Sequence, residues 1–231
     1  MFITLLGAPG CGKGTQAKRI CAYYNVPHIS TGDIFRQEIK NNPLNGGDLA
    51  GYINEGNLVP DEIVIKFTKE RLRQEDCKNG ALLDGFPRTL PQAKALDEIC
   101  FKYKVLNLIV DRVTLIKRVL GRRVCGVCAK NYNISENALS DYACGDCESI
   151  SSRQQCDYCE LKKIRQQCDC GGELFSRDDD NAEVFTQRLK VYDEWTAPLI
   201  DYYQKKGNLI SIDGFGQEDA VFERIKQALG K

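Results

Sequence analysis

A glycine-rich loop near the start of the chain constrains its fold more than any other segment. The apolar run Phe2–Leu6 leads directly into the loop Gly7-Ala8-Pro9-Gly10-Cys11-Gly12-Lys13-Gly14-Thr15. A short run without polar alternation is typical of a buried strand, and the loop opens a predicted helix. Glycines let the backbone approach a phosphate, amide N–H groups face the anion, and Lys13 adds a positive charge. The segment therefore predicts a phosphate-binding loop between a strand and a helix.

Three further apolar runs are candidates for buried strands of the same sheet. They cover residues 81–83, 105–110 and 209–212, and stretches with helical spacing of apolar residues lie between them. Strands that alternate with helices predict an α/β fold in which helices cover both faces of a parallel sheet. The 231 residues are enough for one large core and one or two small insertions.

The helices before the last strand carry two local signals. Asp180 and Glu183 have the spacing of a capping box, which predicts that a helix opens there. An apolar stripe then runs from Phe185 to Leu199, and Pro198 predicts a break in it.

The charge balance limits the partners that we expect. The 32 Lys and Arg residues cancel the 32 Asp and Glu residues, which argues against broad binding to nucleic acid or to an anionic membrane. No apolar run approaches the roughly 20 residues of a membrane helix. Residues 1–9 lack the basic start of a signal peptide, so we expect a cytoplasmic location. His28 is the only histidine, which argues against histidine-based metal sites and triads, and we predict that it packs.

Six separated motifs together resemble those of the adenylate kinases, in the long-lid form found in bacteria. They are the loop at 7–15, STGDIFR at 30–36, DGFPRTLPQ at 84–92, GRRV at 121–124, RDDD at 177–180, and Arg188. The match covers the whole chain apart from extra residues within the lid. It implies a P-loop nucleoside monophosphate kinase fold with a core at 1–29, 60–121 and 179–231, an AMP-binding insert at 30–59 and a metal-binding lid insert at 122–178. It also implies a monomer that catalyses Mg-ATP + AMP ⇌ 2 ADP.

The same resemblance implies roles for individual residues. The expected catalytic residues are Lys13, Asp84, Arg88, Arg122, Arg177 and Arg188. The expected ATP-binding residues are Gly10, Cys11, Gly12, Lys13, Gly14, Thr15, Arg118 and Arg122, although Thr15 follows Lys13 one position later than in the generic phosphate loop. The expected AMP-binding residues are Thr31, Arg36, Ile53, Val59, Gly85, Arg88, Gln92, Arg177 and Arg188.

These residue types suit phosphoryl transfer. The reaction needs aligned phosphates and neutralised charge more than covalent help from the protein. Guanidinium groups grip phosphate oxygens in pairs, and Gln92 can offer both a donor and an acceptor to adenine. Asp84 ends the apolar run at 81–83, where a carboxylate faces the ligand crevice of an α/β sheet and can hold water on Mg²⁺, and Asp33 could assist it.

A cysteine-rich segment interrupts the α/β pattern. The chain has 12 cysteines, and eight form the pairs Cys125 and Cys128, Cys144 and Cys147, Cys156 and Cys159, and Cys168 and Cys170. Residues 124–174 hold too few aliphatic side chains for an ordinary core, so cross-links must support them. Two pairs of thiolates complete a tetrahedral site, so four pairs predict two structural Zn²⁺ ions. Disulfides or free thiols are the alternative.

The pairing of these cysteines is open. In a nested scheme the first and last pairs share one metal, and in a sequential scheme the first two pairs do. The residues after Cys170 resemble those after the last ligand pair of the family, which favours the nested scheme. The 15-residue gap between Cys128 and Cys144 is close to the family spacing, which favours the sequential one.

Two other functions compete with this prediction. One is a kinase that uses UMP or CMP as acceptor or GTP as donor, although kinases for UMP or CMP more usually carry alanine at the position of Thr31. The other is a zinc-knuckle adaptor on an inactive kinase scaffold. Between Cys125 and Cys170, seven acidic residues outnumber five basic ones, whereas a knuckle that binds nucleic acid should be basic.

Overall fold

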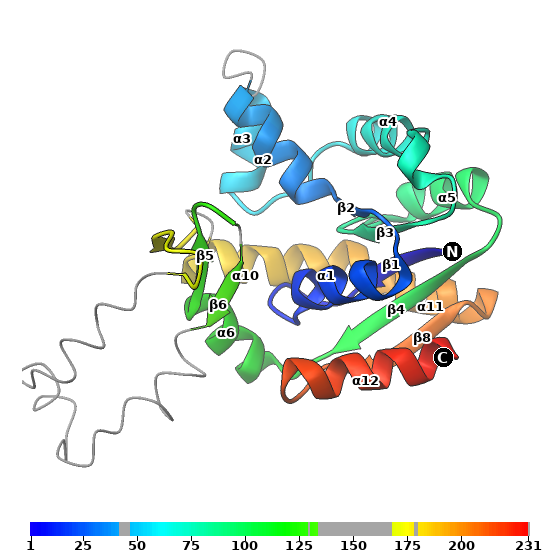
Figure 1. Cartoon of the computed structure of the whole chain (residues 1–231). Helices are drawn as coiled ribbons and strands as arrows, with labels where there is room; N and C mark the ends of the chain where they lie inside the picture. The colour runs from blue at the N-terminus through cyan, green and yellow to red at the C-terminus, as the bar shows by residue number, and fades with distance from the viewer. Residues whose placement is uncertain (42–46, 129, 134–167, 178–179, 231) are drawn as a thin grey trace, which may run out of the picture.

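The computed structural model describes residues 1–41, 47–128, 130–133, 168–177 and 180–230. Its centre is a five-stranded sheet in the order β2-β3-β1-β4-β8, and all of its pairings are parallel (Figure 1). The strands are β1 Phe2–Leu6, β2 His28–Ser30, β3 Ala81–Asp84, β4 Tyr103–Ile109 and β8 Leu209–Asp213. The predicted parallel α/β sheet is therefore confirmed, and β2 is a strand that the apolar pattern did not predict.

Helices connect these strands and cover both faces of the sheet (Figure 1). The helices before residue 121 are α1 Lys13–Tyr24, α2 Thr31–Asn41, α3 Gly47–Asn54, α4 Asp61–Leu72, the short 3₁₀ helix η1 Glu75–Cys77, α5 Leu90–Ile99 and α6 Arg112–Leu120. After it come α10 Ala182–Val191, the π-helical turn η2 Tyr192–Thr196, α11 Pro198–Lys206 and α12 Glu218–Leu229.

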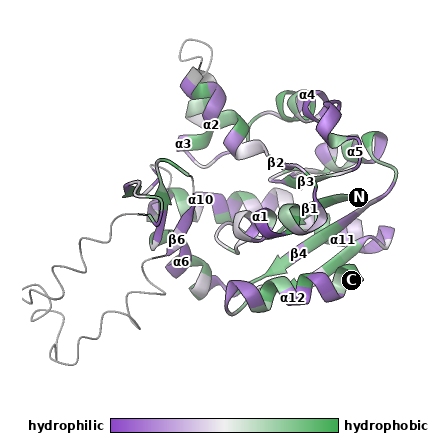
Figure 2. Ribbon diagram, viewed as in Figure 1, coloured by the Kyte–Doolittle hydropathy of each residue, from purple (hydrophilic) through white to green (hydrophobic). Residues whose placement is uncertain are grey.

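The alternation of side chains along the strands builds a separate core on each face of the sheet. Along β4, Val105 joins one apolar cluster, whereas Leu106 and Leu108 join the other. The first cluster packs against α2, α4, α5 and α11, and the second packs against α1, α6, α10 and α12. Figure 2 shows apolar residues along β4 and mixed polarity on the helices. Successive side chains of a strand point to opposite faces of the sheet, and both faces are buried here. The central strands are therefore continuous apolar runs in the sequence.

A small second sheet lies beyond the end of α6 (Figure 1). It has the order β6-β5-β7, with β5 Arg122–Cys125, β6 Asn131–Asn133 and β7 Leu174–Phe175, and both pairings are antiparallel. The helices α2 and α3 project from the main sheet after β2 (Figure 1). Within the described residues, no helix has the length and apolar character of a membrane span.

The start of α10 differs from the predicted capping box. Asn181, not Asp180, caps the helix, and its side chain accepts a hydrogen bond of 2.9 Å from the backbone N–H of Val184. The Asp180 side chain is almost fully buried against Arg122, so it is not available to cap the helix. The break expected at Pro198 is confirmed, because Pro198 is the first residue of α11.

Candidate active site

The phosphate-binding loop joins β1 to α1 as predicted. Gly10 and Gly12 have positive φ angles of 86° and 97°. Glycine adopts such angles without the strain that a side chain would cause. A Cβ atom on Gly7 would lie 2.7 Å from both the Cys11 Sγ and the Leu108 carbonyl oxygen. Lys13 Nζ donates to the carbonyl oxygens of Gly7 at 2.6 Å and Ala8 at 3.0 Å. The loop is thus compact, and the lysine lies across it.

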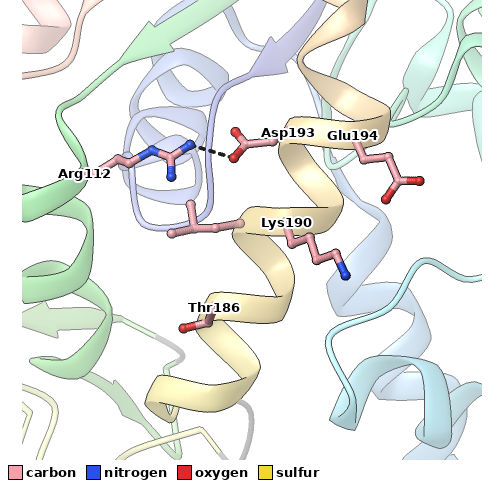
Figure 3. A pocket seen from close by; sticks show the side chains of 6 residues that line it. Arg112, Thr186, Lys190, Asp193 and Glu194 are labelled. Carbon is pink, nitrogen blue, oxygen red and sulfur yellow. Dashed lines mark hydrogen bonds and ion pairs between the residues drawn. The ribbon is translucent and has the colours of Figure 1, made fainter.

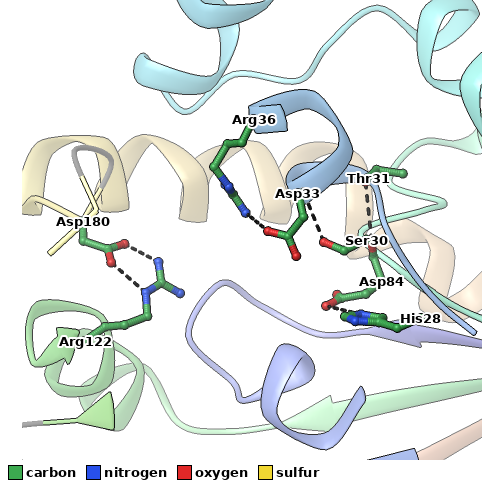
Figure 4. A network of polar contacts seen from close by, with 8 residues as sticks. All are labelled: His28, Ser30, Thr31, Asp33, Arg36, Asp84, Arg122 and Asp180. Atoms are coloured by element: carbon green, nitrogen blue, oxygen red, sulfur yellow. Dashed lines mark hydrogen bonds and ion pairs between the residues drawn. The ribbon is translucent and has the colours of Figure 1, made fainter. Parts of the chain in front are cut away.

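Asp84 lies beside this loop because parallel strands end at the same edge of the sheet. In the strand register, Asp84 is opposite both Leu5 and Ser30. A Cβ atom on Gly14 would lie 3.7 Å from Asp84 Oδ2, so the carboxylate lies close to the first turn of α1. His28 Nε2 lies 3.5 Å from the same carboxylate oxygen (Figure 4). The sequence predicted packing for His28, and the contact with Asp84 is a feature that only the structure reveals.

A pocket beside Asp84 collects most of the residues that the sequence predicted for AMP. Its lining residues are Thr31, Gly32, Phe35, Arg36, Ile53, Gly56, Asn57, Leu58, Val59, Val64, Gly85, Arg88, Gln92 and Arg188. Of the predicted AMP-binding residues, only Arg177 is missing from this lining. Apolar side chains and three arginines share the pocket, a combination that suits a ligand with a flat base and an anionic end.

The carbonyl group of Gly85 organises one wall of the pocket. It accepts hydrogen bonds of 3.0 Å from Thr31 Oγ1 and of 3.0 Å from Arg88 Nε. Gly85 has a φ of +83°, and a Cβ atom there would lie 2.8 Å from Thr31 Oγ1 and 2.9 Å from Arg88 Nη2. The two side chains can therefore approach each other only because residue 85 is a glycine.

Positive charge is concentrated near this pocket. Desolvation lowers the pKa of Arg88 most, Asp84 opposes the shift, and the like charges of Arg188 and Arg36 lower the pKa further. Burial alone would raise the pKa of Asp33, but hydrogen bonding and charge from Arg36, with a further charge from Arg177, lower it overall. These couplings place four arginines in one electrostatic environment, which favours an anionic ligand.

Two of the predicted arginines are paired with carboxylates (Figure 4). Arg36 Nη2 lies 2.7 Å from Asp33 Oδ1. Arg122 donates to both carboxylate oxygens of Asp180, and its Nε lies 2.7 Å from Asp180 Oδ2. A carboxylate and a phosphate offer similar oxygen pairs to a guanidinium. The guanidinium groups of Arg36 and Arg122, which now pair with carboxylates, could therefore bind phosphate in the same way.

Four cysteines of the second sheet region lie together. The Sγ atoms of Cys125, Cys128, Cys168 and Cys170 are all within 4.8 Å of one another. Cys125 Sγ lies 3.5 Å from Cys170 Sγ, and Cys128 Sγ lies 3.4 Å from Cys168 Sγ. A disulfide would need about 2.05 Å, whereas Zn–S bonds of about 2.3 Å in a tetrahedron separate sulfurs by about 3.8 Å. The spacing therefore fits a four-sulfur metal site far better than disulfides.

The backbone around this cluster is shaped to fit it. The amides of Val127 and Cys128 point to Cys125 Sγ at 3.4 and 3.5 Å. A Cβ atom on Gly172 would lie 2.6 Å from Cys125 Sγ, so a side chain there would displace this sulfur. This grouping is the outer set of the nested scheme. The other predicted ligands, Cys144, Cys147, Cys156 and Cys159, lie outside the described residues.

A second pocket contains none of the predicted residues. Arg112, Thr186, Leu189, Lys190, Asp193 and Glu194 line it, and it lies between α6 and the helices α10 and η2 (Figure 3). Arg112 Nη2 and Asp193 Oδ2 are 2.6 Å apart across it. Its charged groups are exposed and carry both signs, so the pocket does not favour either an anionic or a cationic ligand.

Part of the main pocket lies outside the residues that the motifs predict. The turn at Gly56 and Asn57 packs against α10, where a Cβ on Gly56 would lie 3.0 Å from Arg188 Cγ. Gln187 Nε2 donates to Asn57 Oδ1 at 3.0 Å. Residues in a short turn have no periodic pattern, so the contact between this turn and α10 had no signal in the sequence.

Comparisons with known proteins agree with this geometry. The family model for adenylate kinase matches residues 5–208. Proteins named adenylate kinase are similar over the full chain: 43% identity with one from Alkaliphilus oremlandii (100% of this chain, 99% of the relative), and 45% with one from Acetivibrio thermocellus (99% and 98%). One from Caldanaerobacter subterraneus is 44% identical, over 99% of this chain and 96% of the relative. The chain therefore belongs to the adenylate kinase family and is a kinase.

Proposed function

We propose that the enzyme transfers the terminal phosphoryl group of Mg-ATP in line to AMP and releases two molecules of ADP. The observation that carries the proposal is the pocket that Thr31, Arg88 and Gln92 share beside the phosphate-binding loop. Its apolar side can hold a base, and its arginines can hold the acceptor phosphate. The parallel strands end between this pocket and the loop, where two phosphates could meet.

The phosphate-binding loop would hold the donor. Its backbone amides and Lys13 would bind the ATP phosphates, and Arg118, whose Nη1 donates to the Gly214 carbonyl at 3.3 Å, would lie on the adenine. Lys13 now donates to loop carbonyls, so it would exchange these weak partners for phosphate oxygens. Asp84 fits the role of holding Mg²⁺ through water, because it offers carboxylate oxygens beside the loop. Mg²⁺ would neutralise phosphate charge when bound.

Arginines would neutralise the charge that moves during transfer. Arg36 and Arg88 would hold the AMP phosphate, while Arg122, Arg177 and Arg188 would surround the transferring group. Asp33 and Asp180 now hold Arg36 and Arg122, and each carboxylate would be displaced by phosphate. These ion pairs would keep the arginines oriented until nucleotide binds, which reduces the ordering cost of binding.

The residue ranges of the proposed parts follow from the same assignment. Residues 1–29, 60–121 and 179–231 would form the core, residues 30–59 the AMP-binding insert and residues 122–178 the lid. The lid would close over the donor and exclude water, which strengthens the electrostatic contacts of the site. The pairing of Arg122 with Asp180 would act at the hinge between lid and core.

A structural zinc ion would stiffen the lid. The observed sulfur spacing of Cys125, Cys128, Cys168 and Cys170 fits a closed tetrahedral site, which leaves no open position for substrate. Cys144, Cys147, Cys156 and Cys159 would hold a second zinc ion by the nested scheme. The metal would hold β5 and β7 together so that the lid moves as one body.

Acceptor and donor preference test the proposed reaction. With ATP as donor, AMP should be phosphorylated at least about tenfold more efficiently than UMP, CMP or GMP, because the adenine edge can satisfy the Gln92 amide. A coupled assay of ADP formation measures each kcat/KM, and GTP in place of ATP tests the donor. Preference for UMP or CMP would overturn the AMP assignment. No turnover with any nucleotide would favour the adaptor.

Gly85→Ala tests the wall of the proposed AMP pocket. The methyl group would push Arg88 and Thr31 apart, so we expect KM for AMP to rise on the order of tenfold or more. Gly207→Ala is the matched control, because Gly207 also has a positive φ of +74° but a Cβ there would meet no atom within 4 Å. The control should lower the melting temperature without changing KM. Equal KM values in the two variants would contradict the role of Gly85.

A further inference from the structure

The side chain of Gln92 is held by two partners inside the protein. Its Nε2 donates to Asp61 Oδ1 at 2.7 Å, and its Oε1 accepts from the backbone N–H of Arg88 at 2.8 Å. Gln92 is 1% exposed and also lines the main pocket. Asp61 is the first residue of α4, and its Oδ1 accepts a further hydrogen bond of 2.8 Å from Thr89 Oγ1. Asp61 does not line the pocket itself, so it lies behind Gln92.

The chemistry of these partners determines which way the amide faces. A carboxylate only accepts hydrogen bonds, so Asp61 requires the NH₂ end of Gln92. A backbone N–H only donates, so Arg88 requires the oxygen end. Rotation of the amide by 180° would place donor against donor and acceptor against acceptor in one buried site, which is costly. Two independent partners therefore select the same orientation.

One donor and one acceptor remain for a ligand. An amide nitrogen carries two hydrogens and an amide oxygen has two acceptor positions, and among the described residues each of these atoms of Gln92 has one partner. Adenine presents an N–H donor at N6 and an acceptor at N1. Hypoxanthine presents the reverse, an acceptor at O6 and a donor at N1. A freely rotating glutamine could serve either base, whereas a fixed one can serve only one of them.

We propose that Asp61 is a positioning residue for base recognition: it fixes the amide of Gln92 so that the acceptor pocket selects a 6-amino purine over a 6-oxo purine. The inference rests on the proposed binding of AMP in this pocket. Its location supports it, because Asp61 stands at the start of α4, where the positive end of the helix stabilises a carboxylate. Thr89 further restrains the same oxygen, so the contact is held from two elements.

The test compares AMP with inosine monophosphate as acceptors. In Asp61→Ala, kcat/KM for AMP should fall about tenfold through KM, since one charged hydrogen bond is lost. The kcat/KM for inosine monophosphate should stay unchanged or rise. The ratio of kcat/KM for AMP to kcat/KM for inosine monophosphate should therefore fall about tenfold. The KM for ATP should not change. Glu62→Ala is the matched control, because Glu62 is an exposed carboxylate in the same helical turn.

Two further variants keep the inference open to refutation. Asp61→Asn retains an acceptor oxygen and should retain most of the preference. Asp61→Leu fills similar volume without an acceptor, and it carries the test if the alanine variant does not fold. A parallel fall for both acceptors with an unchanged ratio would show a purely structural role and overturn the inference. Equal loss in the asparagine and alanine variants would also overturn it. A wild-type enzyme that phosphorylates neither acceptor would instead refute the proposed function.

Discussion

Arg88→Ala is expected to reduce kcat/KM for AMP phosphorylation on the order of a thousandfold. The structure explains why this guanidinium should matter so much, because the protein holds it before any ligand binds. Its Nε donates to the Gly85 carbonyl at 3.0 Å, and its own carbonyl accepts from Thr196 Oγ1 at 2.9 Å. Binding would therefore not need to order this side chain, and its charge would be directed at phosphate from the start.

Steady-state kinetics with both nucleotides varied measures this effect. Arg73→Ala serves as the control, because Arg73 is an exposed arginine at the end of α4 that does not line the pocket. Arg88→Lys should recover only part of the activity, since an ammonium cannot make the paired contact. If Arg88→Ala kept activity within about tenfold of the wild type, the arginine could not lie at the reacting phosphates.

Cys168→Ser is expected to remove one of about two zinc ions per chain. Cys168 Sγ lies 3.4 Å from Cys128 Sγ, and all four sulfurs of the cluster are within 4.8 Å of one another. A metal bound only by the folded chain stabilises it, so we also expect a lower melting temperature. Elemental mass spectrometry of protein purified without chelator gives the zinc content.

Cys21→Ser is the matched control for this loss. Burial, and then the charge of Asp84, raise the pKa of the Cys21 thiol to about 11, so it stays protonated and should bind no metal. Gly172→Ala should lower zinc content without removing a ligand, because its methyl group would displace Cys125 Sγ. Wild-type enzyme with about one zinc ion would leave the inner four cysteines unexplained. Active enzyme with no metal would refute the zinc proposal.

Contacts between distant residues explain where sequence reasoning went wrong. The spacing of Asp180 and Glu183 predicted a capping box, but Asp180 pairs with Arg122 and Asn181 caps α10 instead. The Asp180 carboxylate could cap the helix or pair with the distant Arg122, and it forms the buried ion pair. His28 gave no signal beyond an apolar neighbourhood, and its contact with Asp84 arises because β2 and β3 are adjacent.

The motifs predicted residues of the AMP pocket but not the partners that orient them. Thr31 comes from one motif and Gly85 and Gln92 from another, and the parallel sheet brings all three to one pocket. The family pattern named these residues, whereas their internal partners had no motif. Asp61 lies 31 positions before Gln92, and nothing in the spacing links the two. Base selectivity is therefore expected to depend on a residue that sequence reasoning had passed over.

Features that depend on neighbouring residues could be predicted from the sequence. Strands, helices and the phosphate-binding loop follow from apolar period and glycine placement, because these act through local sterics and burial. Three features could be read only from the folded chain: the carboxylate that each arginine pairs with, the cysteines that lie together, and the orientation of the Gln92 amide. Each of these depends on packing between distant elements, since hydrogen bonds form only at contact distance and interactions between charges weaken with distance.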